Sequence, residues 1–441
     1  MRAVLLLILT CSLFCACGLS SRIQKTAQKT VLASAALRTA HVGISVYEPA
    51  AGKWWYNYQG DKYFVPASNT KLATCYAAMK YLGDSLVGGR IAIDDQNRLR
   101  IFPTGDPTFL NSEFRHQPLL EKIKGYSSIL LSVDGWKEER WGSGWSWNDY
   151  DAAYMAERSP LPVYGNVASF RMVADTLQTI PSKLPVAAAP DLGFDKKSYV
   201  TSTKSFQIQR RLDENEFFLK PAPGKFTTAT IPLRTDAGII SKLLEDTLKA
   251  DVASSVTAAG FNYHPQTRAI HSQPTDSLLK PMMHRSDNFF AEQSLLMVSN
   301  EVLGFMNDEK IIDTLLKTDF SDLPQKPRWV DGSGLSRYNL FTPQDLVMIL
   351  DKMKRQAGMD RIRAILPTGN EGTLAGYYKA DSTSLYAKTG TLSGVVAISG
   401  FMTTAGGREL VFSVLVNNHQ ASATQVRRAV EGFLQSLRKE H

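Results

Sequence analysis

Ser68 and Lys71 lie three residues apart at the start of a stretch whose apolar residues recur at helical spacing. Three residues are just under one helical turn, so the Lys71 amine and the Ser68 hydroxyl are predicted to share one helix face. A serine hydroxyl becomes a good nucleophile only when a neighbouring group accepts its proton. Lys71 can accept it when neutral, and burial, the positive end of the helix and a second nearby cation would each lower its pKa. The pair therefore predicts a serine nucleophile with a lysine base.

This spacing alone is common in a chain of such length, and Ser277 and Lys280 repeat it. Ser68 differs in context, because a predicted strand precedes it and a helix is predicted to begin at it. Ser277, in contrast, is soon followed by Pro281. The context therefore favours Ser68 as the nucleophile.

A second motif consists of Ser286 and Asn288, which precede an apolar helical stretch. A hydroxyl and an amide on one short segment could relay a proton and hydrogen-bond a substrate amide. Taken alone, such a pair is more simply interpreted as a helix N-cap.

The third motif, Lys388-Thr389-Gly390 followed by Thr391, is the most specific of the three because it is rare by chance. On a strand edge, alternate residues would present a cation and a hydroxyl. Gly390 would let a ligand approach the backbone closely, and exposed amides could pair with a peptide as an added strand.

In this order, SxxK, SxN and KTG are the signature of penicillin-binding proteins and class A β-lactamases. The chain resembles the serine DD-peptidases that act on bacterial peptidoglycan. The interval from Ser68 to Ser286 is too long for a class A β-lactamase. It is similar to that of the class C low-molecular-mass penicillin-binding proteins, the D-alanyl-D-alanine carboxypeptidase/endopeptidase family. Residues 105–108 (GDPT), 147–149 (WND) and 331–337 (DGSGLSR) add to the likeness.

The resemblance implies a role for each matched residue. Ser68 would attack the D-alanyl carbonyl and become an acyl-enzyme, with Lys71 as the base. Ser286 would pass the proton to the leaving nitrogen, and Asn288 would hold a substrate amide. Lys388 would supply positive charge near Ser286 and near the substrate carboxylate.

Substrate contacts are implied for the rest of the third motif. Thr389 would bind the terminal carboxylate, Gly390 would lie beside the ligand, and the backbone amides of Ser68 and Thr391 would form an oxyanion hole. Asp149 could pair with the free amine of a diaminopimelate-type stem peptide, although a solvated turn aspartate is the simpler interpretation. Residues 331–337 are expected to form a turn and cap.

The implied substrates are peptidoglycan stem peptides, with β-lactams as covalent inhibitors and with no cofactor. The seven histidines are scattered without an HExxH motif, so a zinc hydrolase is not expected. Two alternatives remain open: a serine β-lactamase, which would need fast deacylation, and a non-catalytic peptidoglycan-binding protein. The sequence offers no convincing second general base, which favours slow penicilloyl turnover and hence the peptidase.

Composition and the first residues indicate an exported globular protein. The chain has 441 residues, of which 44% are hydrophobic and 21% charged, which fits two or three domains. Its net charge of +8 suits an anionic wall or membrane surface better than nucleic acid. Residues 1–17 form a predicted signal peptide that ends in a sequence resembling a lipoprotein box, so a membrane tether through Cys17 is an open alternative for this periplasmic protein. Cys75 is the single cysteine beyond this leader and is expected to be a small buried hydrophobe.

The elements predicted to position these motifs come from both chain ends. Period-two alternation predicts one hairpin over 42–59 and another over 395–417, and helices are predicted over 69–83 and from a capping box at Ser422. Together they predict an α/β (α+β) fold of the penicillin-binding/β-lactamase-like kind, with an antiparallel sheet flanked by helices. The expected serine DD-peptidase domain is discontinuous, comprising 25–90 and 256–441. Residues 91–255 are expected to be one or two inserted, mostly-β modules, with a helix over 236–250 leading back to the first domain.

Overall fold

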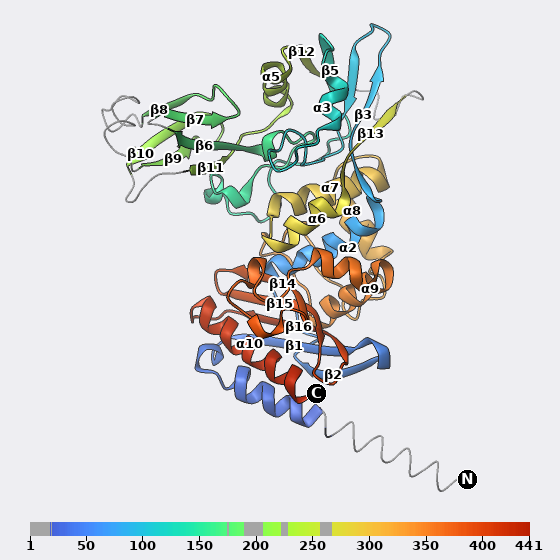
Figure 1. The fold of residues 1–441 in the computed structure, drawn as a ribbon, viewed down its shortest axis with the longest axis vertical. Coiled ribbons are helices and arrows are strands. Elements are labelled where there is room, and N and C mark those ends of the chain that lie inside the picture. Colours follow the sequence, from blue (N-terminus) through green and yellow to red (C-terminus); the bar gives the residue numbers. More distant parts are fainter. Residues whose placement is uncertain (1–17, 19, 174–175, 189–205, 222–227, 256–266) are drawn as a thin grey trace, which may run out of the picture. The chain divides into compact units, whose positions relative to one another are not determined.

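The computed structural model describes residues 18, 20–173, 176–188, 206–221, 228–255 and 267–441 (Figure 1). The predicted leader, 1–17, lies outside the described residues. The chain divides into two compact units. Unit 1 comprises Met1–Ala77, Leu279–Asp287 and Ile312–His441, and unit 2 comprises Ala78–Leu278 and Asn288–Ile311. The functional domain boundaries expected from the sequence stay a prediction.

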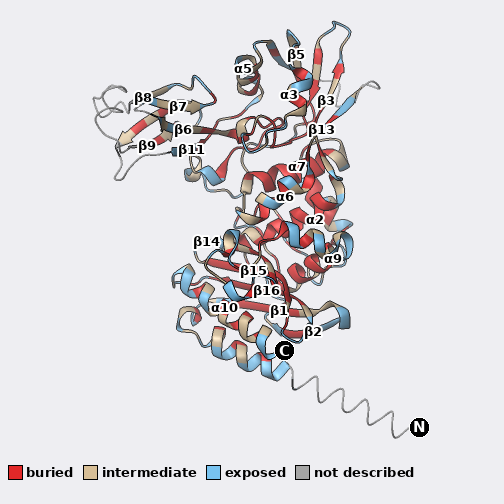
Figure 2. Ribbon diagram, in the orientation of Figure 1, coloured by how far each residue is buried: buried red, intermediate tan, exposed pale blue. Residues whose placement is uncertain are grey.

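Unit 1 is built on a five-stranded sheet in the order β14-β15-β16-β1-β2, in which all neighbours are antiparallel. The strands are β1 His41–Glu48, β2 Lys53–Tyr58, β14 Leu385–Leu392, β15 Val395–Thr403 and β16 Glu409–Asn417. Both predicted hairpins are confirmed, and they share one sheet. Strands β15 and β16 are buried along almost their whole length, as Figure 2 shows, because elements cover the sheet on both faces.

Helix α10 (Ala423–Glu440) packs on this sheet through Val426, Val430 and Phe433, which are buried in the same core as the strands. The predicted capping box is confirmed, because the Ser422 hydroxyl accepts a hydrogen bond from the Gln425 backbone N–H.

Three further segments complete the layers around this sheet. A helical segment over 20–27 and η1 (Gln28–Leu32) join the core that α10 covers, and η2 (Ala35–Leu37) follows. Helix α9 (Pro343–Ile365) contacts β16, β1 and β15. The predicted α+β architecture with a helix-flanked antiparallel sheet is confirmed.

The short elements that carry the motifs lie beside β14. A 3-10 turn, η4 (Ala67–Thr70), contacts β14 and β15 and leads into α2 (Lys71–Tyr81). Helix α6 (Thr275–His284) ends just before Ser286, and the single turn η9 (Gly372–Leu374) contacts β14.

Unit 2 contains a second five-stranded sheet, in the order β12-β5-β4-β3-β13. Its elements are β3 Ser85–Ile93, β4 Leu99–Phe102, α3 Pro118–Ile123, β5 Ser128–Ser132, α5 Ala237–Leu248, β12 Asp251–Ser255 and β13 Arg268–Pro274. Strand β5 pairs in parallel with β4 and β12, which the sequence analysis did not foresee. Helix α5 is confirmed, but Ile240 and Leu244 pack in the core of unit 2 because the crossover to a parallel strand requires a covering helix.

Two three-stranded sheets complete the described strands of unit 2, in the orders β8-β10-β9 and β11-β6-β7. Their strands are β6 Val167–Val173, β7 Thr176–Ile180, β8 Val186–Ala188, β9 Phe206–Arg210, β10 Phe217–Pro221 and β11 Thr228–Pro232. Helix α7 (Asn288–Leu303) belongs to unit 2, and α8 (Asp308–Lys317) begins there. Within the described residues, every helix is too short or too polar to cross a bilayer.

Candidate active site

Ser68 and Lys71 meet at the junction of η4 and α2. The Lys71 Nζ donates a hydrogen bond to the Ser68 Oγ over 3.0 Å, and Lys71 is fully buried whereas Ser68 is partly accessible. The three-residue spacing thus brings an amine and a hydroxyl into direct contact. The geometry is that of a nucleophile with a proton acceptor beside it.

A second contact fixes Lys71. Its Nζ also donates to the Ser333 backbone carbonyl over 2.7 Å. Both carboxylate oxygens of the buried Asp331 hold this loop: they accept from the backbone N–H groups of Gly334 and Ser336, each over 2.7 Å. The expected turn and cap over 331–337 is therefore also a support for the lysine. Sequence reasoning missed that support, because its contacting atom belongs to the backbone.

The turn that carries the nucleophile has an unusual backbone. Ala67 has φ of 47°, a left-handed conformation that costs about 1–3 kcal/mol and is concentrated at functional sites. Gly334, at φ of 82°, lies directly against it: a Cβ at Gly334 would be 1.9 Å from the Ala67 carbonyl oxygen. The close approach requires glycine at 334, and it joins the 331–337 loop to the turn of Ser68.

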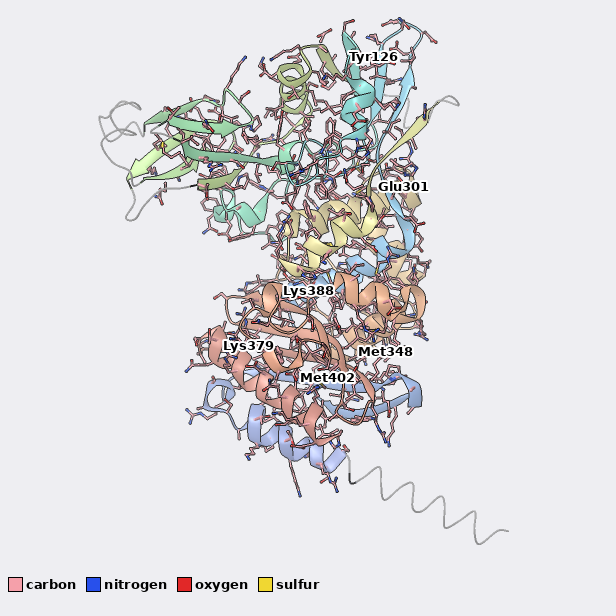
Figure 3. The ribbon with its side chains drawn as sticks, viewed as in Figure 1. Tyr126, Glu301, Met348, Lys379, Lys388 and Met402 are labelled. Atoms are coloured by element: carbon pink, nitrogen blue, oxygen red, sulfur yellow. The ribbon has the colours of Figure 1, made fainter. Side chains whose placement is uncertain are left out.

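Ser286 and Lys388 form the second hydroxyl–lysine pair. The Lys388 Nζ donates to the Ser286 Oγ over 2.9 Å and to the Thr389 carbonyl over 2.7 Å. Lys388, labelled on β14 in Figure 3, is fully buried. Burial, and after it the charge of Lys71, lowers the pKa of Lys388 well below 10.5. Sequence analysis expected burial and a second cation to act on Lys71; both act on Lys388, and Lys71 is fully buried as well.

Strand β14 reaches the nucleophile through Gly390. A Cβ at Gly390 would lie 2.7 Å from the Pro66 carbonyl oxygen and 3.0 Å from the Ser68 backbone nitrogen. The Asn69 amide also donates to the Lys388 carbonyl over 3.1 Å. Because Gly390 has no side chain, the turn that carries Ser68 can approach β14 this closely. Direct contact of Gly390 with a ligand stays a prediction.

The two threonines of the third motif have partners that the sequence analysis did not single out. The Thr389 hydroxyl hydrogen-bonds the Thr373 hydroxyl on η9 over 2.7 Å. The Thr391 hydroxyl accepts from Arg427 on α10 over 2.6 Å. No sequence signal identifies either partner, since each reaches β14 from a separate element.

Asn288 and Asp149 belong to unit 2. Asn288 is the first residue of α7, and its side-chain amide donates to the Tyr154 backbone carbonyl over 3.0 Å. Asp149 lies on η5 (Trp147–Asp149), and burial together with this carboxylate raises the pKa of the Tyr154 hydroxyl. Tyr154 thus connects the two predicted residues, and their part in substrate binding stays a prediction.

Unit 1 thus combines a helix-flanked antiparallel sheet with two hydroxyl–lysine pairs and a KTG strand. This combination defines a serine hydrolase of the penicillin-binding class. In the described part of the chain, no cluster of three or more His, Cys, Asp or Glu side chains is arranged to hold a metal ion.

Comparison with known proteins identifies the family. The chain matches the model of the D-Ala-D-Ala carboxypeptidase 3 (S13) family over residues 24–437, and it belongs to that family of serine-type DD-peptidases. The resemblance stated from the motifs is confirmed. A D-alanyl-D-alanine carboxypeptidase of Actinomadura sp. (strain R39) is 27% identical over 439 residues, which cover 89% of this chain and 80% of the relative.

Two comparisons involve Haemophilus influenzae. Its D-alanyl-D-alanine carboxypeptidase DacB is 26% identical over 399 residues, with 82% of each chain covered. The crystal structure of its penicillin binding protein 4 (dacB) superposes with a TM-score of 0.72 at 19% identity, covering 95% of this chain and 99% of that one. This protein has also been solved in complex with a β-lactam. The superposition shows that the two chains share a fold.

Proposed function

We propose that the protein hydrolyses peptidoglycan stem peptides and cross-links, as a D-alanyl-D-alanine carboxypeptidase and DD-endopeptidase, through an acyl-enzyme on Ser68. The observation that carries this proposal is the presence of two hydroxyl–lysine contacts in one unit. Lys71 lies 3.0 Å from the Ser68 hydroxyl, and Lys388 lies 2.9 Å from the Ser286 hydroxyl. An acyl transfer needs one proton removed from the nucleophile and one delivered to the leaving nitrogen.

In the acylation step, the Ser68 Oγ attacks the carbonyl carbon of the D-alanyl amide while its proton passes to the Lys71 Nζ. The carbonyl oxygen becomes an oxyanion, held by the backbone N–H groups of Ser68 and Thr391. In other hydrolases, one such donor contributes about 3–4 kcal/mol. The close approach of Gly390 to the Ser68 backbone nitrogen supports this pairing of amides.

Collapse of the intermediate breaks the carbon–nitrogen bond and releases the amine. Ser286 donates its hydroxyl proton to the leaving nitrogen and is reprotonated with the proton that Lys71 took from Ser68, so that Lys71 is neutral again. The Ser286 hydroxyl is polarised by the buried Lys388. Water then attacks the acyl carbon, the ester bond to the Ser68 oxygen breaks, one proton of the water passes to that oxygen, and the acid product departs.

The substrate is held along β14, which lies at the end of the strand order in its sheet. An extended peptide adds to such an edge through backbone hydrogen bonds. The hydroxyl of Thr389 binds the carboxylate of the leaving group. Asn288 and Asp149 hold, respectively, the side-chain amide of the substrate and the free amine of the stem peptide.

The same machinery accounts for two further parts of the proposal. β-Lactams acylate Ser68 because their strained amide carbonyl and their carboxylate are arranged like the D-alanyl carbonyl and the carboxylate of the leaving group in the peptide substrate. The protein is exported to the periplasm through the signal peptide 1–17. Mass spectrometry of the mature protein tests both the cleavage site and whether Cys17 carries a lipid.

Digestion of purified sacculi tests reaction and substrate together. The wild type is expected to release D-alanine and to consume cross-linked dimers, whereas Ser68→Ala does neither. Ser277→Ala is the matched control, because Ser277 has the same spacing to a lysine but is exposed on α6. It should retain wild-type activity.

Two results would favour the alternatives. Hydrolysis of benzylpenicillin at many turnovers per second would indicate a β-lactamase. Failure of labelled penicillin to acylate Ser68, together with unchanged muropeptides, would indicate a non-catalytic wall-binding protein.

A further inference from the structure

Arg427 reaches the third motif from the first turns of α10. Its Nη2 donates to the Thr391 hydroxyl over 2.6 Å. It also lines a pocket together with Thr373, Tyr377 and Thr389, with Leu374 and Ile398 among the apolar lining. A guanidinium and several hydroxyls therefore surround one small pocket beside β14.

The charge of Arg427 is not compensated within the described residues. Its neighbour Arg428 pairs with Glu431 over 2.5 Å and lies over the Tyr377 ring. Arg427 lies over the same ring at 5.9 Å, but no carboxylate of the described chain lies within ion-pair distance of it. A half-buried guanidinium that lines a pocket without an acidic partner favours an anionic occupant.

The hydrogen bond also orients the Thr391 hydroxyl. A hydroxyl carries one proton and two acceptor sites. Because the Thr391 oxygen accepts from Arg427, its own proton is available for a different acceptor, and the positive charge strengthens it as a donor. Among the pocket-lining residues, the Thr389 hydroxyl donates to the Thr373 hydroxyl over 2.7 Å, which leaves the Thr373 proton available to an occupant of the pocket.

We propose that Arg427 is a positioning residue that, through the Thr391 hydroxyl, holds the carboxylate next to the scissile bond of the substrate. This inference rests on the proposed function. In both the terminal D-alanine and a cross-link to diaminopimelate, the carbon that bears the leaving nitrogen also bears a carboxylate. Arg427 thus selects leaving groups with this anion, whereas a purely structural Arg427 would only join α10 to β14.

Two D-alanyl thioester substrates distinguish an Arg427 that positions the carboxylate from a purely structural Arg427. The thiol leaving group of the first substrate ends in a carboxylate, and that of the second ends in the corresponding carboxamide. For Arg427→Ala we expect kcat/KM to fall by about 10- to 100-fold on the carboxylate, mainly through KM, and by less than about 3-fold on the carboxamide. Arg427→Lys keeps the charge without the planar fork, so it should restore part of the loss on the carboxylate.

Arg428→Ala is the matched control, since Arg428 lies on the same helix and ring but hydrogen-bonds Glu431 and the Gly376 carbonyl. It should leave the ratio between the two thioesters at the wild-type value. Equal losses on both thioesters for Arg427→Ala, or no loss on either, would overturn the positioning role. A wild type that cleaves neither thioester would overturn the proposed function and, with it, this inference.

Discussion

Lys388 Nζ lies 2.9 Å from the Ser286 hydroxyl in a fully buried position where the charge of Lys71 also acts on it. Burial comes first and Lys71 second among the causes that lower the pKa of Lys388 well below 10.5. A buried amine near a second amine opposes folding whenever it is charged. Lys388 is therefore present for its role in catalysis, and it lowers the free energy of unfolding of the protein.

Replacing Lys388 with methionine is expected to stabilise the protein and to inactivate it. The pKa of Lys388 is lower in the folded chain than in the unfolded chain. Unfolding therefore takes up a proton between the folded pKa and 10.5, and stability falls as the pH falls through that range. Lys388→Met lacks this dependence, so its free energy of unfolding at neutral pH should be about 1–3 kcal/mol higher. Penicillin acylation should slow by about 100- to 10,000-fold.

Urea unfolding at several pH values measures the first effect, and labelled penicillin measures the second. Lys379→Met is the control, because Lys379 is exposed on η10 (Lys379–Asp381). It should leave both quantities close to those of the wild type. A Lys388→Met protein that is less stable than the wild type at every pH would contradict the argument.

Gly334 is expected to be essential for the turn that carries Ser68. Alanine there would combine a left-handed φ of 82° with a Cβ only 1.9 Å from the Ala67 carbonyl oxygen. Since a backbone atom cannot move aside as a flexible side chain can, Gly334→Ala should lower the free energy of unfolding by about 3 kcal/mol or more. The folded fraction should also acylate slowly, because the same loop holds Lys71 through Ser333.

Gly407 is the control for Gly334, because it has a similar left-handed φ but no neighbouring atom that an added Cβ would clash with. Its φ is 79°, and a Cβ there would meet nothing within 4 Å. Gly407→Ala should therefore cost only about 1 kcal/mol and leave acylation unchanged. Similar losses of stability for the two variants, measured by urea unfolding, would show that the contact with Ala67 does not matter.

The parts of the site that could be predicted from the sequence are those with a local signal. Ser68 and Lys71 share one helical turn, so their spacing sufficed to place them together. The same spacing at Ser277 and Lys280 leaves both side chains exposed on α6, which shows that spacing needs a context. Ser286 and Lys388 are separated by 102 positions, and only the order of the motifs joined them.

What could not be predicted depends on contacts between distant segments. Arg427 is 36 positions from Thr391, and Thr373 is 16 from Thr389, with no periodic pattern that links either pair. In the fold, alternation and a capping box identified both hairpins of unit 1 and α10, because these signals are local. The parallel pairing of β5 lacks such a signal, since its partner β12 follows only after the covering helix α5.

Glu138 of unit 2 is expected to make stability depend on pH near neutrality. Three carboxylates surround the buried guanidinium of Arg158: Glu138 at 3.1 Å, Asp308 at 2.5 Å and Glu292 at 3.6 Å. Burial raises the pKa of Glu138 to about 7, with Arg158 opposing this shift and Asp308 adding to it. Because the folded pKa exceeds the unfolded value of 4.5, the stabilisation is complete below that value and is lost as the pH rises through about 7.

Glu138→Gln keeps the shape of the side chain and removes its titration. The wild type should lose about 1–3 kcal/mol of unfolding free energy as the pH rises from about 5 to about 8, and the variant should lose clearly less. Glu139→Gln is the matched control, because the Glu139 side chain is exposed and Arg158 contacts only its backbone carbonyl. Urea unfolding over this pH range measures the slopes. Equal slopes for the wild type and Glu138→Gln would place the titrating proton elsewhere in the protein, since the amide introduced by this substitution could neither bind nor release it.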